Sequence, residues 1–345
     1  MSVKVGIMGY GTIGKRVADA VTLQKDMELV GITGNSYSYR MEIAKNKGYK
    51  IFSVKGDDEF KKVCEISSRD CIVPDGTFQN LLDECDVILD CTPKKVPVEN
   101  KEKYYIPSRK KAIFQGGEKS KVADVSFVAQ CNYAKALNKQ FIRVVSCNTT
   151  GLCRTLNPIK EKYGIDSVHA TLVRRAADPW DVESGPINAI VPVLELPSHH
   201  GPDVQTVLPD VNIFTTAMSV PTTLMHMHSL TVDMKKEASA LDILDLFRAT
   251  SRVRVVRNME KITSTAEIME YAKDLGRSRG DMYEICVWEE GIGVKGKKLF
   301  YLQAVHQESD VVIETVDAIR AATGFKDGQK SIEMTNQSMG VDLDK

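Results

Sequence analysis

A glycine pattern near the N-terminus constrains the fold of this chain more than any other feature. Residues 9–14 read GYGTIG, a G-x-G-x-x-G pattern placed between a strand-like run at 3–8 and a helix-like run at 13–23. The first glycine permits a tight turn, the second lets the backbone approach a diphosphate, and the third allows close packing of helix on strand. Unpaired N–H groups at the helix start attract an anion. The pattern therefore predicts a dinucleotide site.

The order of strand-like and helix-like runs predicts two domains of different class. In residues 1–146, short apolar runs separated by helical segments predict a Rossmann-like α/β domain with a parallel sheet; these runs are 28–33, 86–91, 111–115 and 143–146. After residue 147, long β-branched runs predict an α+β domain with a mixed or antiparallel sheet; they are 167–174, 187–194, 211–220, 224–234, 282–289 and 298–306. Helices are expected at 238–250 and 309–323. The expected boundaries are 1–146 for the dinucleotide domain and 147–306 for the catalytic domain.

Composition excludes several classes of protein. The chain has 345 residues with 46 Lys+Arg and 46 Asp+Glu, so no overall basic field exists to hold nucleic acid. No run approaches the length of a membrane span, and no signal peptide is evident, so we expect no membrane partner. Eight scattered cysteines without a CxxC pair indicate free thiols in a reducing cytoplasm.

The end of the second strand bears on which cofactor is accepted. An acid there commonly holds the ribose 2′-hydroxyl of NAD, but residues 31–36 read GITGNS and contain none. A 2′-phosphate would meet no repulsion, and Asn35, Ser36 or Arg40 could hold it. We expect NADP to be accepted, with NAD as a second cofactor. Gly116 and Gly117, after a later strand, allow close approach to a nicotinamide ribose.

Cys147 is the candidate nucleophile. The run SCNTTG at 146–151 follows a strand and precedes helical spacing, so Cys147 is expected at a helix N-terminus, where the cysteine pKa falls. Asn148 and Thr149 offer donors to an oxyanion or a phosphate. Cys153 is the rival, but it lies inside the helix. A thiolate beside a nicotinamide implies attack on an aldehyde, hydride departure to give a thioester, and release of the acyl group by a second nucleophile.

The second half of the chain contains the candidate base and anion ligands. His226 and His228 point to one face of a strand, where either could act as the base, while the other would be a core histidine. No third ligand of matching spacing accompanies them, so no metal site is expected. Arg174, followed by a second arginine, and the pair His199-His200 suit phosphate anions.

These residues resemble a known family. The runs VGIMGYGTIGKRVADAV, DVILDCTP, FQGGEK, SCNTTGLCR and TTLMHMHSL occur in the order seen in archaeal-type (class II) phosphorylating glyceraldehyde-3-phosphate dehydrogenases. The resemblance implies reversible oxidative phosphorylation of D-glyceraldehyde 3-phosphate to 1,3-bisphosphoglycerate with inorganic phosphate and NAD or NADP. It also implies a homotetramer, and a C-terminal helix in 307–345 that returns to the nucleotide domain.

The resemblance also assigns roles to residues. It implies Cys147 as nucleophile and His226, rather than His228, as base. For the substrate it implies contacts with Ser146, Asn148, His199 and His200. For the cofactor it implies contacts with Thr12, Ile13, Gly117, Arg175 and Gln307, with Gln303 a weaker choice than Gln307 for the carboxamide. One departure is Gly34, where family members often carry Lys, which argues against a strong preference for NADP.

Two other functions remain open from the residues. An enzyme similar to aspartate-semialdehyde dehydrogenase would use the same thiol chemistry with a carboxylate pocket. A non-catalytic dinucleotide-binding protein could use its cysteine as a redox switch.

Overall fold

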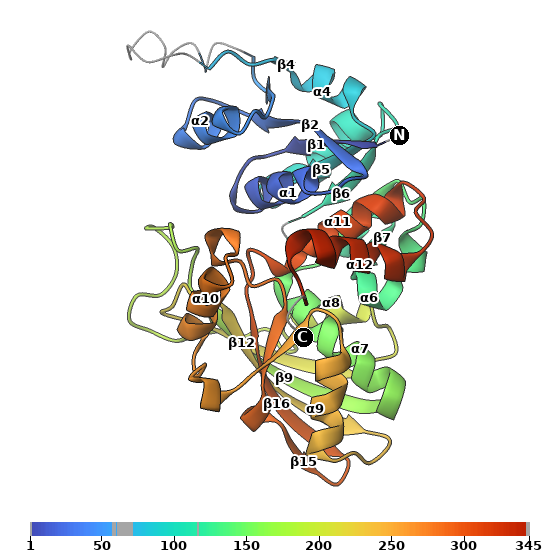
Figure 1. Ribbon diagram of the computed structural model, residues 1–345, viewed down its shortest axis with the longest axis vertical. Coiled ribbons are helices and arrows are strands. Elements are labelled where there is room, and N and C mark those ends of the chain that lie inside the picture. Colours follow the sequence, from blue (N-terminus) through green and yellow to red (C-terminus); the bar gives the residue numbers. More distant parts are fainter. Residues whose placement is uncertain (1, 57–59, 61–71, 116, 343–345) are drawn as a thin grey trace. The chain divides into compact units, whose positions relative to one another are not determined.

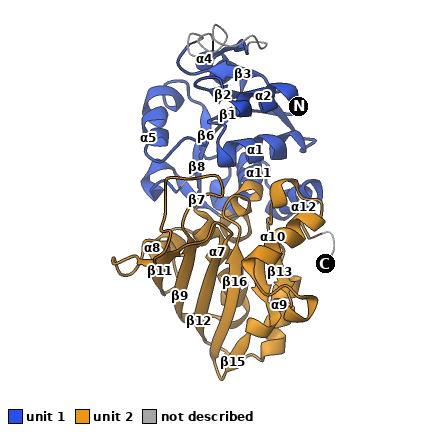
Figure 2. Cartoon of the chain, turned by 90° about the vertical axis from the view of Figure 1, so that its left-hand side faces the viewer, with its two compact units in different colours: residues 1–127, 133–144, 314–339 blue, residues 128–132, 145–313, 340–345 orange. Residues whose placement is uncertain are grey.

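The computed structural model describes residues 2–56, 60, 72–115 and 117–342. Contacts divide the chain into two compact units (Figure 2). Unit 1 contains residues 1–127, 133–144 and 314–339, and unit 2 contains residues 128–132, 145–313 and 340–345. The last part of the chain therefore contributes a segment to each unit.

Unit 1 is built on an eight-stranded parallel sheet of order β4-β3-β2-β1-β5-β6-β8-β7. The strands are β1 (Val3–Met8), β2 (Met27–Gly34), β3 (Ile51–Ser53), β4 (Gly76–Thr77), β5 (Val87–Asp90), β6 (Lys111–Phe114), β7 (Val125–Phe127) and β8 (Phe141–Val144). The described helices of unit 1 are α1 (Thr12–Thr22), α2 (Tyr39–Asn46), α4 (Phe78–Glu84), α5 (Val96–Asn100), α11 (Asp310–Ala322, shared with unit 2) and α12 (Gly328–Met339). Buried apolar side chains on both faces explain the apolar runs of the central strands.

Unit 2 is built on a mixed sheet of order β10-β11-β9-β12-β16-β14-β13. Its strands are β9 (Ile165–Arg175), β10 (Val191–Pro192), β11 (Ile213–Val220), β12 (His226–Met234), β13 (Val253–Val256), β14 (Ile285–Trp288), β15 (Gly293–Lys295) and β16 (Lys298–Val305). Strand β12 runs antiparallel to both of its neighbours, β9 and β16. The helices are α6 (Ala129–Asn132), α7 (Cys147–Tyr163), α8 (His200–Gln205), α9 (Ala240–Ala249) and α10 (Thr265–Asp274). The expected fold class, a Rossmann-like parallel sheet and a second mixed sheet, is confirmed.

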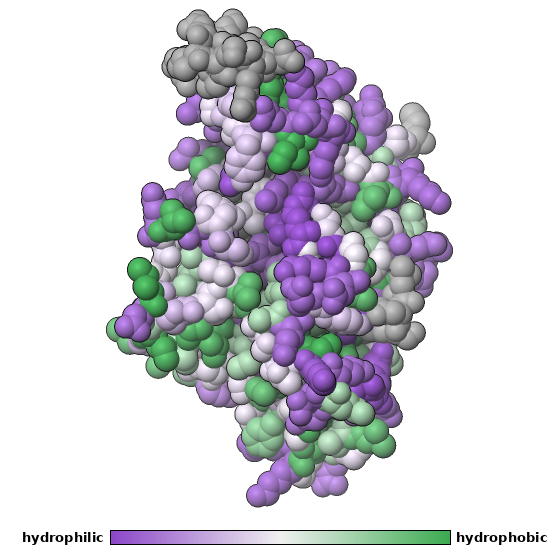
Figure 3. All heavy atoms as spheres, turned by 60° about the vertical axis from the view of Figure 1, so that its left-hand side comes forward, coloured by the Kyte–Doolittle hydropathy of each residue, from purple (hydrophilic) through white to green (hydrophobic). Residues whose placement is uncertain are grey.

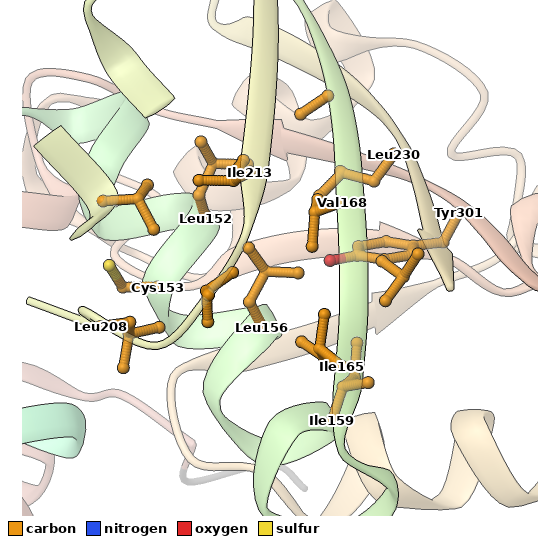
Figure 4. Packing of buried hydrophobic residues seen from close by; sticks show 14 of the residues in the cluster. Leu152, Cys153, Leu156, Ile159, Ile165, Val168, Leu208, Ile213, Leu230 and Tyr301 are labelled. Carbon is orange, nitrogen blue, oxygen red and sulfur yellow. The ribbon is translucent and has the colours of Figure 1, made fainter. Parts of the chain in front are cut away.

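Helix α7 packs on the mixed sheet and contacts β9, β12, β14 and β16 (Figure 1). Its apolar face enters the core of unit 2, where Leu152, Leu156 and Ile159 lie among side chains of the sheet (Figure 4). Cys153 belongs to the same cluster and is fully buried. Burial among apolar side chains makes Cys153 a packing residue and removes it as a rival nucleophile.

Some elements differ from the sequence-based expectation. The run 187–194 forms only the two-residue strand β10, because most of it lies exposed in a loop and pairs with nothing. The pattern did not predict α10 or β13, whose burial depends on neighbouring strands. The expected single C-terminal helix is two helices, α11 and α12, separated by Gly324, which has a positive φ. None of the helices in the described ranges is long and apolar enough to cross a bilayer.

Candidate active site

The glycine loop of unit 1 has the backbone that the sequence predicts. Gly9 has φ +93°, a left-handed conformation that favours glycine. A side chain on Gly14 would place its Cβ 1.9 Å from the Gly9 carbonyl oxygen, so this position excludes any other residue. At Gly11 no atom lies within 4 Å of an added Cβ, and no side chain caps the N-terminus of α1. The N–H groups at the start of α1 are thus open to an anion.

A cavity of about 590 Å³ lies beside this loop. Of the residues expected to bind a cofactor, Gly9, Gly11 and Asn35 line it, and the Gly9 N–H donates to Thr33 Oγ1 at 2.9 Å. Thr12, Ile13, Gly14 and Gly117 do not line this cavity. Gly117 has φ +75° and open space at its Cβ position, while Gly116 lies outside the described residues.

The charge around the cavity is positive. Its described lining contains the cations Arg40 and Lys55 and no acidic side chain. The sequence analysis did not single out Lys55, because it follows β3, far along the chain from the glycine loop. Gly34 is buried, and a Cβ there would lie 2.6 Å from Met41 Sδ. A side chain at residue 34 would therefore require Met41 to move, and the cations at this cavity are supplied by Arg40 and Lys55.

Asp90 is a second residue that sequence analysis missed. It is fully buried at the end of β5, and its Oδ1 accepts from the Thr92 N–H at 3.0 Å. Its Oδ2 accepts from Asn100 Nδ2 at 2.8 Å and from the Tyr105 hydroxyl at 2.7 Å. Asp90 thus fixes the turn whose Thr92 lines the cavity. The signal in the sequence was an acid at the end of a buried strand.

In unit 2, Cys147 is the first residue of α7. Ser146 caps this helix, because its Oγ accepts the Thr149 N–H at 3.4 Å. Thr149 Oγ1 donates to Asp203 Oδ2 at 2.6 Å, which ties the first turn of α7 to α8. The hydroxyls of Ser146 and Thr149, expected to contact substrate, are therefore engaged in holding the first turn of the helix.

The prediction that the Cys147 pKa is lowered is wrong for this chain without ligands. Burial raises the pKa of the Cys147 thiol, and the Asp310 carboxylate raises it further. The Arg175 guanidinium and a backbone hydrogen bond at Asn148 act in the opposite direction but do not compensate. Loss of water around the thiolate is the largest of these contributions. The thiol is therefore protonated at neutral pH until a ligand or a base changes its surroundings.

His226 lies on β12 beside Arg175. The Arg175 backbone N–H donates to His226 Nδ1 at 3.0 Å, so the neutral ring carries its proton on Nε2. Burial lowers the pKa of His226 well below its usual value, and the neighbouring His228, Arg175 and Arg174 lower it further. The ring is neutral at pH 7. The Arg175 side chain itself donates to the Ala177 carbonyl and to Asp178, and lies 3.6 Å from Glu308.

The candidate phosphate ligands are in different environments. Arg174 Nη2 donates to Ser219 Oγ at 3.2 Å, while its buried Nε has no acceptor among the described residues. His199 is exposed, but His200 is buried, and burial lowers its pKa to about 3, so its ring is neutral. Arg174 is near enough to both His200 and His226 to lower their pKa. The structure therefore brings Arg174, His200 and His226 together, with Arg174 as a cation.

Two further buried side chains near this site have polar atoms without partners in the described residues. Both the Nε2 and the Oε1 of Gln307 are buried without a hydrogen bond, and so is the Oγ1 of Thr150. A buried amide without partners is costly, so it marks a place where a ligand can supply them. Sequence analysis singled out Gln307 by resemblance and missed this property of Thr150. No group of three or more His, Cys, Asp or Glu in the described ranges could hold a metal ion.

Alkylation measures the state of the Cys147 thiol. In the chain without ligands, we expect iodoacetamide to modify Cys147 slowly at pH 7 and faster as pH rises above 9, because the thiolate is the nucleophile. The variant Arg175→Gln removes a charge that lowers the pKa, so it slows the reaction further at each pH. Mass spectrometry of the peptide that contains Cys147 follows the rate. Lys160→Gln on α7 is the control, and a rate that saturates below pH 8 would contradict the raised pKa.

Comparison with known proteins agrees with this arrangement. Residues 146–290 match the family model described as "Glyceraldehyde 3-phosphate dehydrogenase, C-terminal domain". The chain is 52% identical over 341 residues to glyceraldehyde-3-phosphate dehydrogenase of Pyrococcus abyssi, with 99% of each chain covered. It is 51% identical over 344 residues to the enzyme so named from Methanococcoides burtonii (98% and 99% covered), and 50% identical over 341 residues to that of Methanobacterium formicicum (98% and 99% covered). The chain belongs to the glyceraldehyde-3-phosphate dehydrogenase family, in its archaeal form.

Proposed function

We propose that this chain catalyses the reversible, NAD(P)-dependent oxidative phosphorylation of D-glyceraldehyde 3-phosphate to 1,3-bisphosphoglycerate. The observation that carries the proposal is the position of Cys147 at the first turn of α7, in the same unit as neutral His226 and the cation Arg174. Membership of the family supplies the reaction type. Neither of the two other functions considered from the sequence finds support in the comparisons.

The residues present fit a nicotinamide dinucleotide. In unit 1 the open backbone at Gly11 and the uncapped start of α1 suit a diphosphate. In unit 2 the buried amide of Gln307, which has no hydrogen-bond partner among the described residues, can donate to and accept from a carboxamide. When bound, the nicotinamide accepts the hydride that the substrate carbon releases. Lys55 and Arg40 favour a 2′-phosphate, so we propose that NADP binds as well as NAD.

The thiol of Cys147 attacks the aldehyde carbon, and a C–S bond forms to give a thiohemiacetal. The raised pKa keeps the free thiol protonated, so the thiol proton is transferred as the C–S bond forms and ends on the former carbonyl oxygen, as the hydroxyl of the thiohemiacetal. After hydride departure, a phosphate oxygen attacks the resulting thioester and the sulfur leaves as thiolate. The buried Nε of Arg174 has no acceptor in the described part of the chain, so Arg174 is suited to bind the attacking phosphate or the phosphate group of the substrate. His199 and His200 are proposed to contact the same anions.

His226 is proposed as the base that takes the hydroxyl proton of the thiohemiacetal. Its low pKa keeps it neutral and able to accept a proton down to acid pH. In the resting chain Nδ1 accepts the Arg175 N–H and Nε2 carries the ring proton. Before Nε2 can take a proton, the ring has to change tautomer and release that backbone bond. The reaction therefore requires the Arg175 backbone N–H to move away from His226 Nδ1.

The first test is turnover measured by the absorbance of reduced cofactor, with glyceraldehyde 3-phosphate, with and without inorganic phosphate. We expect turnover to require phosphate, because it releases the acyl group. Cys147→Ser should abolish turnover, since a hydroxyl is a far weaker nucleophile, and His226→Asn should lower kcat by about 10²–10⁴-fold. An active Cys147→Ser variant, or full turnover without phosphate, would contradict the thioester route.

Cofactor binding tests the cavity cations. We expect Lys55→Gln and Arg40→Gln each to weaken NADPH binding about fivefold and NADH binding little, because a partly exposed charge pair contributes about 1 kcal/mol. Fluorescence titration of the reduced cofactors gives both Kd values without turnover. Lys45→Gln on α2, which does not line the cavity, is the control. An equal rise in Kd for NADPH and NADH would show that neither cation contacts the 2′-phosphate.

We propose that the chain forms a homotetramer, as the family resemblance implies. A loop of unit 2 exposes large apolar side chains at Val182, Ile187 and Leu194, which are 94%, 93% and 85% exposed. Exposed hydrophobic side chains also stand among hydrophilic ones on the face drawn in Figure 3. Apolar side chains of this size are commonly buried in a subunit interface.

Light scattering tests the assembly. We expect a mass of four chains, and a smaller mass for Ile187→Lys, because a charge in the interface has no partner. Leu241→Lys on α9, also exposed, should leave the mass unchanged. A monomeric wild-type chain would exclude the tetramer.

We propose the cytoplasm as the location of this enzyme. None of the six cysteines in the described residues forms a disulfide, as in a reducing compartment. Cys64 and Cys71 lie outside the described residues. No nucleic-acid partner is proposed, because the net charge is zero.

A further inference from the structure

A line of buried hydrogen bonds in unit 2 ends on Asn148, the residue after Cys147. The bonds join Tyr301 OH to Thr155 Oγ1 (3.0 Å), Thr155 Oγ1 to Gln303 Oε1 (2.8 Å), Gln303 Nε2 to His228 Nδ1 (3.0 Å) and His228 Nε2 to Asn148 Oδ1 (2.8 Å). All five residues are at most 5% exposed. We call this line the Asn148 relay.

The β-sheet register brings the middle of the relay together. Gln303 on β16 lies directly opposite His228 on β12, so their side chains share one face of the sheet. Thr155 is on α7, two turns after Cys147, and α7 packs on that sheet. The relay therefore connects the sheet to the first turn of the helix that carries the nucleophile.

The relay has a direction. Gln303 Nε2 is a donor only, so His228 Nδ1 accepts from it. Burial lowers the pKa of His228 to about 3, so the ring is neutral and has a single N–H, on Nε2. That N–H donates to Asn148 Oδ1. Both ring nitrogens of His228 are thus occupied within the protein, and this histidine has no nitrogen left with which to take a proton from a substrate.

The hydrogen bond from His228 fixes the orientation of the Asn148 amide. Because its Oδ1 accepts from His228, the amide cannot rotate by 180° without placing its NH₂ group against the N–H of His228. With Oδ1 engaged, Nδ2 is the group that the Asn148 amide has left to offer as a donor. Asn148 also lies in the first turn of α7, where the backbone N–H groups favour negative charge.

We propose that His228 and Gln303 are positioning residues, which hold the Asn148 amide so that its Nδ2 donates to the oxygen of an aldehyde bound covalently at Cys147. This inference rests on the proposed function, because it needs an aldehyde carbon attacked by Cys147. As the C–S bond forms, negative charge develops on that oxygen, and a donor already oriented toward it stabilises this charge without reorganising. The relay contributes in the transition state more than in substrate binding, since the free aldehyde oxygen carries less charge.

The test compares two substitutions of His228 in the otherwise intact enzyme. His228→Gln keeps an amide donor able to reach Asn148 Oδ1, and His228→Leu has similar volume but no donor. We expect His228→Leu to lower kcat about 10- to 100-fold with KM for glyceraldehyde 3-phosphate nearly unchanged, a smaller loss than the 10²–10³-fold typical when an oxyanion donor itself is removed. His228→Gln should recover most of that kcat. Gln303→Leu should resemble His228→Leu.

Leu230→Ala is the matched control for loss of stability. Leu230 is buried on the same strand but takes no part in the relay, so its truncation should lower the Tm while kcat at a temperature well below the Tm stays near the wild-type value. If His228→Leu keeps wild-type kcat, or if it lowers kcat no more than His228→Gln does, the relay is structural only and the proposal fails. An active wild-type enzyme in the same assay shows that the proposed function stands in either case.

A measurement on the wild-type protein covers the case in which the His228 variants do not fold. Long-range ¹H–¹⁵N correlation spectra of the ¹⁵N-histidine-labelled enzyme report the tautomer of each ring. We expect His226 and His228 both to show a neutral ring protonated at Nε2 and unchanged between pH 5 and 9. In Gln303→Leu one of these two signals should be lost or change its tautomer, which assigns it to His228. A His228 ring protonated at Nδ1 would reverse the relay and overturn the proposal.

Discussion

The seating of helix α7 on the mixed sheet of unit 2 is the constraint on which the rest of the site depends. Its apolar face is buried between Leu152 and Ile159, and the buried Arg154 donates to the Tyr283 and Asp310 carbonyl oxygens at 2.8 and 2.7 Å. These contacts fix the rotation of the helix about its axis. The fixed rotation sets the orientation of Cys147 and Asn148 in the first turn. It also places Cys153 in the apolar core.

Burial is the main control on the charge of the titratable groups at this site. The pKa of Cys147 is raised and those of His200, His226 and His228 are lowered, and in each case loss of hydration is the largest cause. All four groups are therefore neutral in the resting chain. A neutral pair of thiol and imidazole suits an enzyme in which charge develops only after the aldehyde arrives, since preoriented donors then act on that charge.

The two histidines of β12 show how one strand separates two roles. His226 accepts the Arg175 backbone N–H at Nδ1 and carries its ring proton on Nε2, whereas His228 has both ring nitrogens bonded within the protein. Alternation along the strand places both rings on one face. Because of these different partners, His226 is the candidate for proton transfer and His228 is a fixed part of the core.

The sequence alone determined the fold class, the glycine loop and the strand-to-helix junction at Cys147, because these depend on local patterns of apolar residues, glycines and caps. It also identified the family, through motifs distributed over the chain. It could not determine the pKa of Cys147, because this depends on hydration in the folded chain. Nor could it determine the partners of His228, because Gln303 and Asn148 lie 75 and 80 positions away in the chain. Nor could it show that Lys55 and Arg40 line one cavity. Only the folded chain brings these groups together, since pairing between distant strands decides which side chains meet.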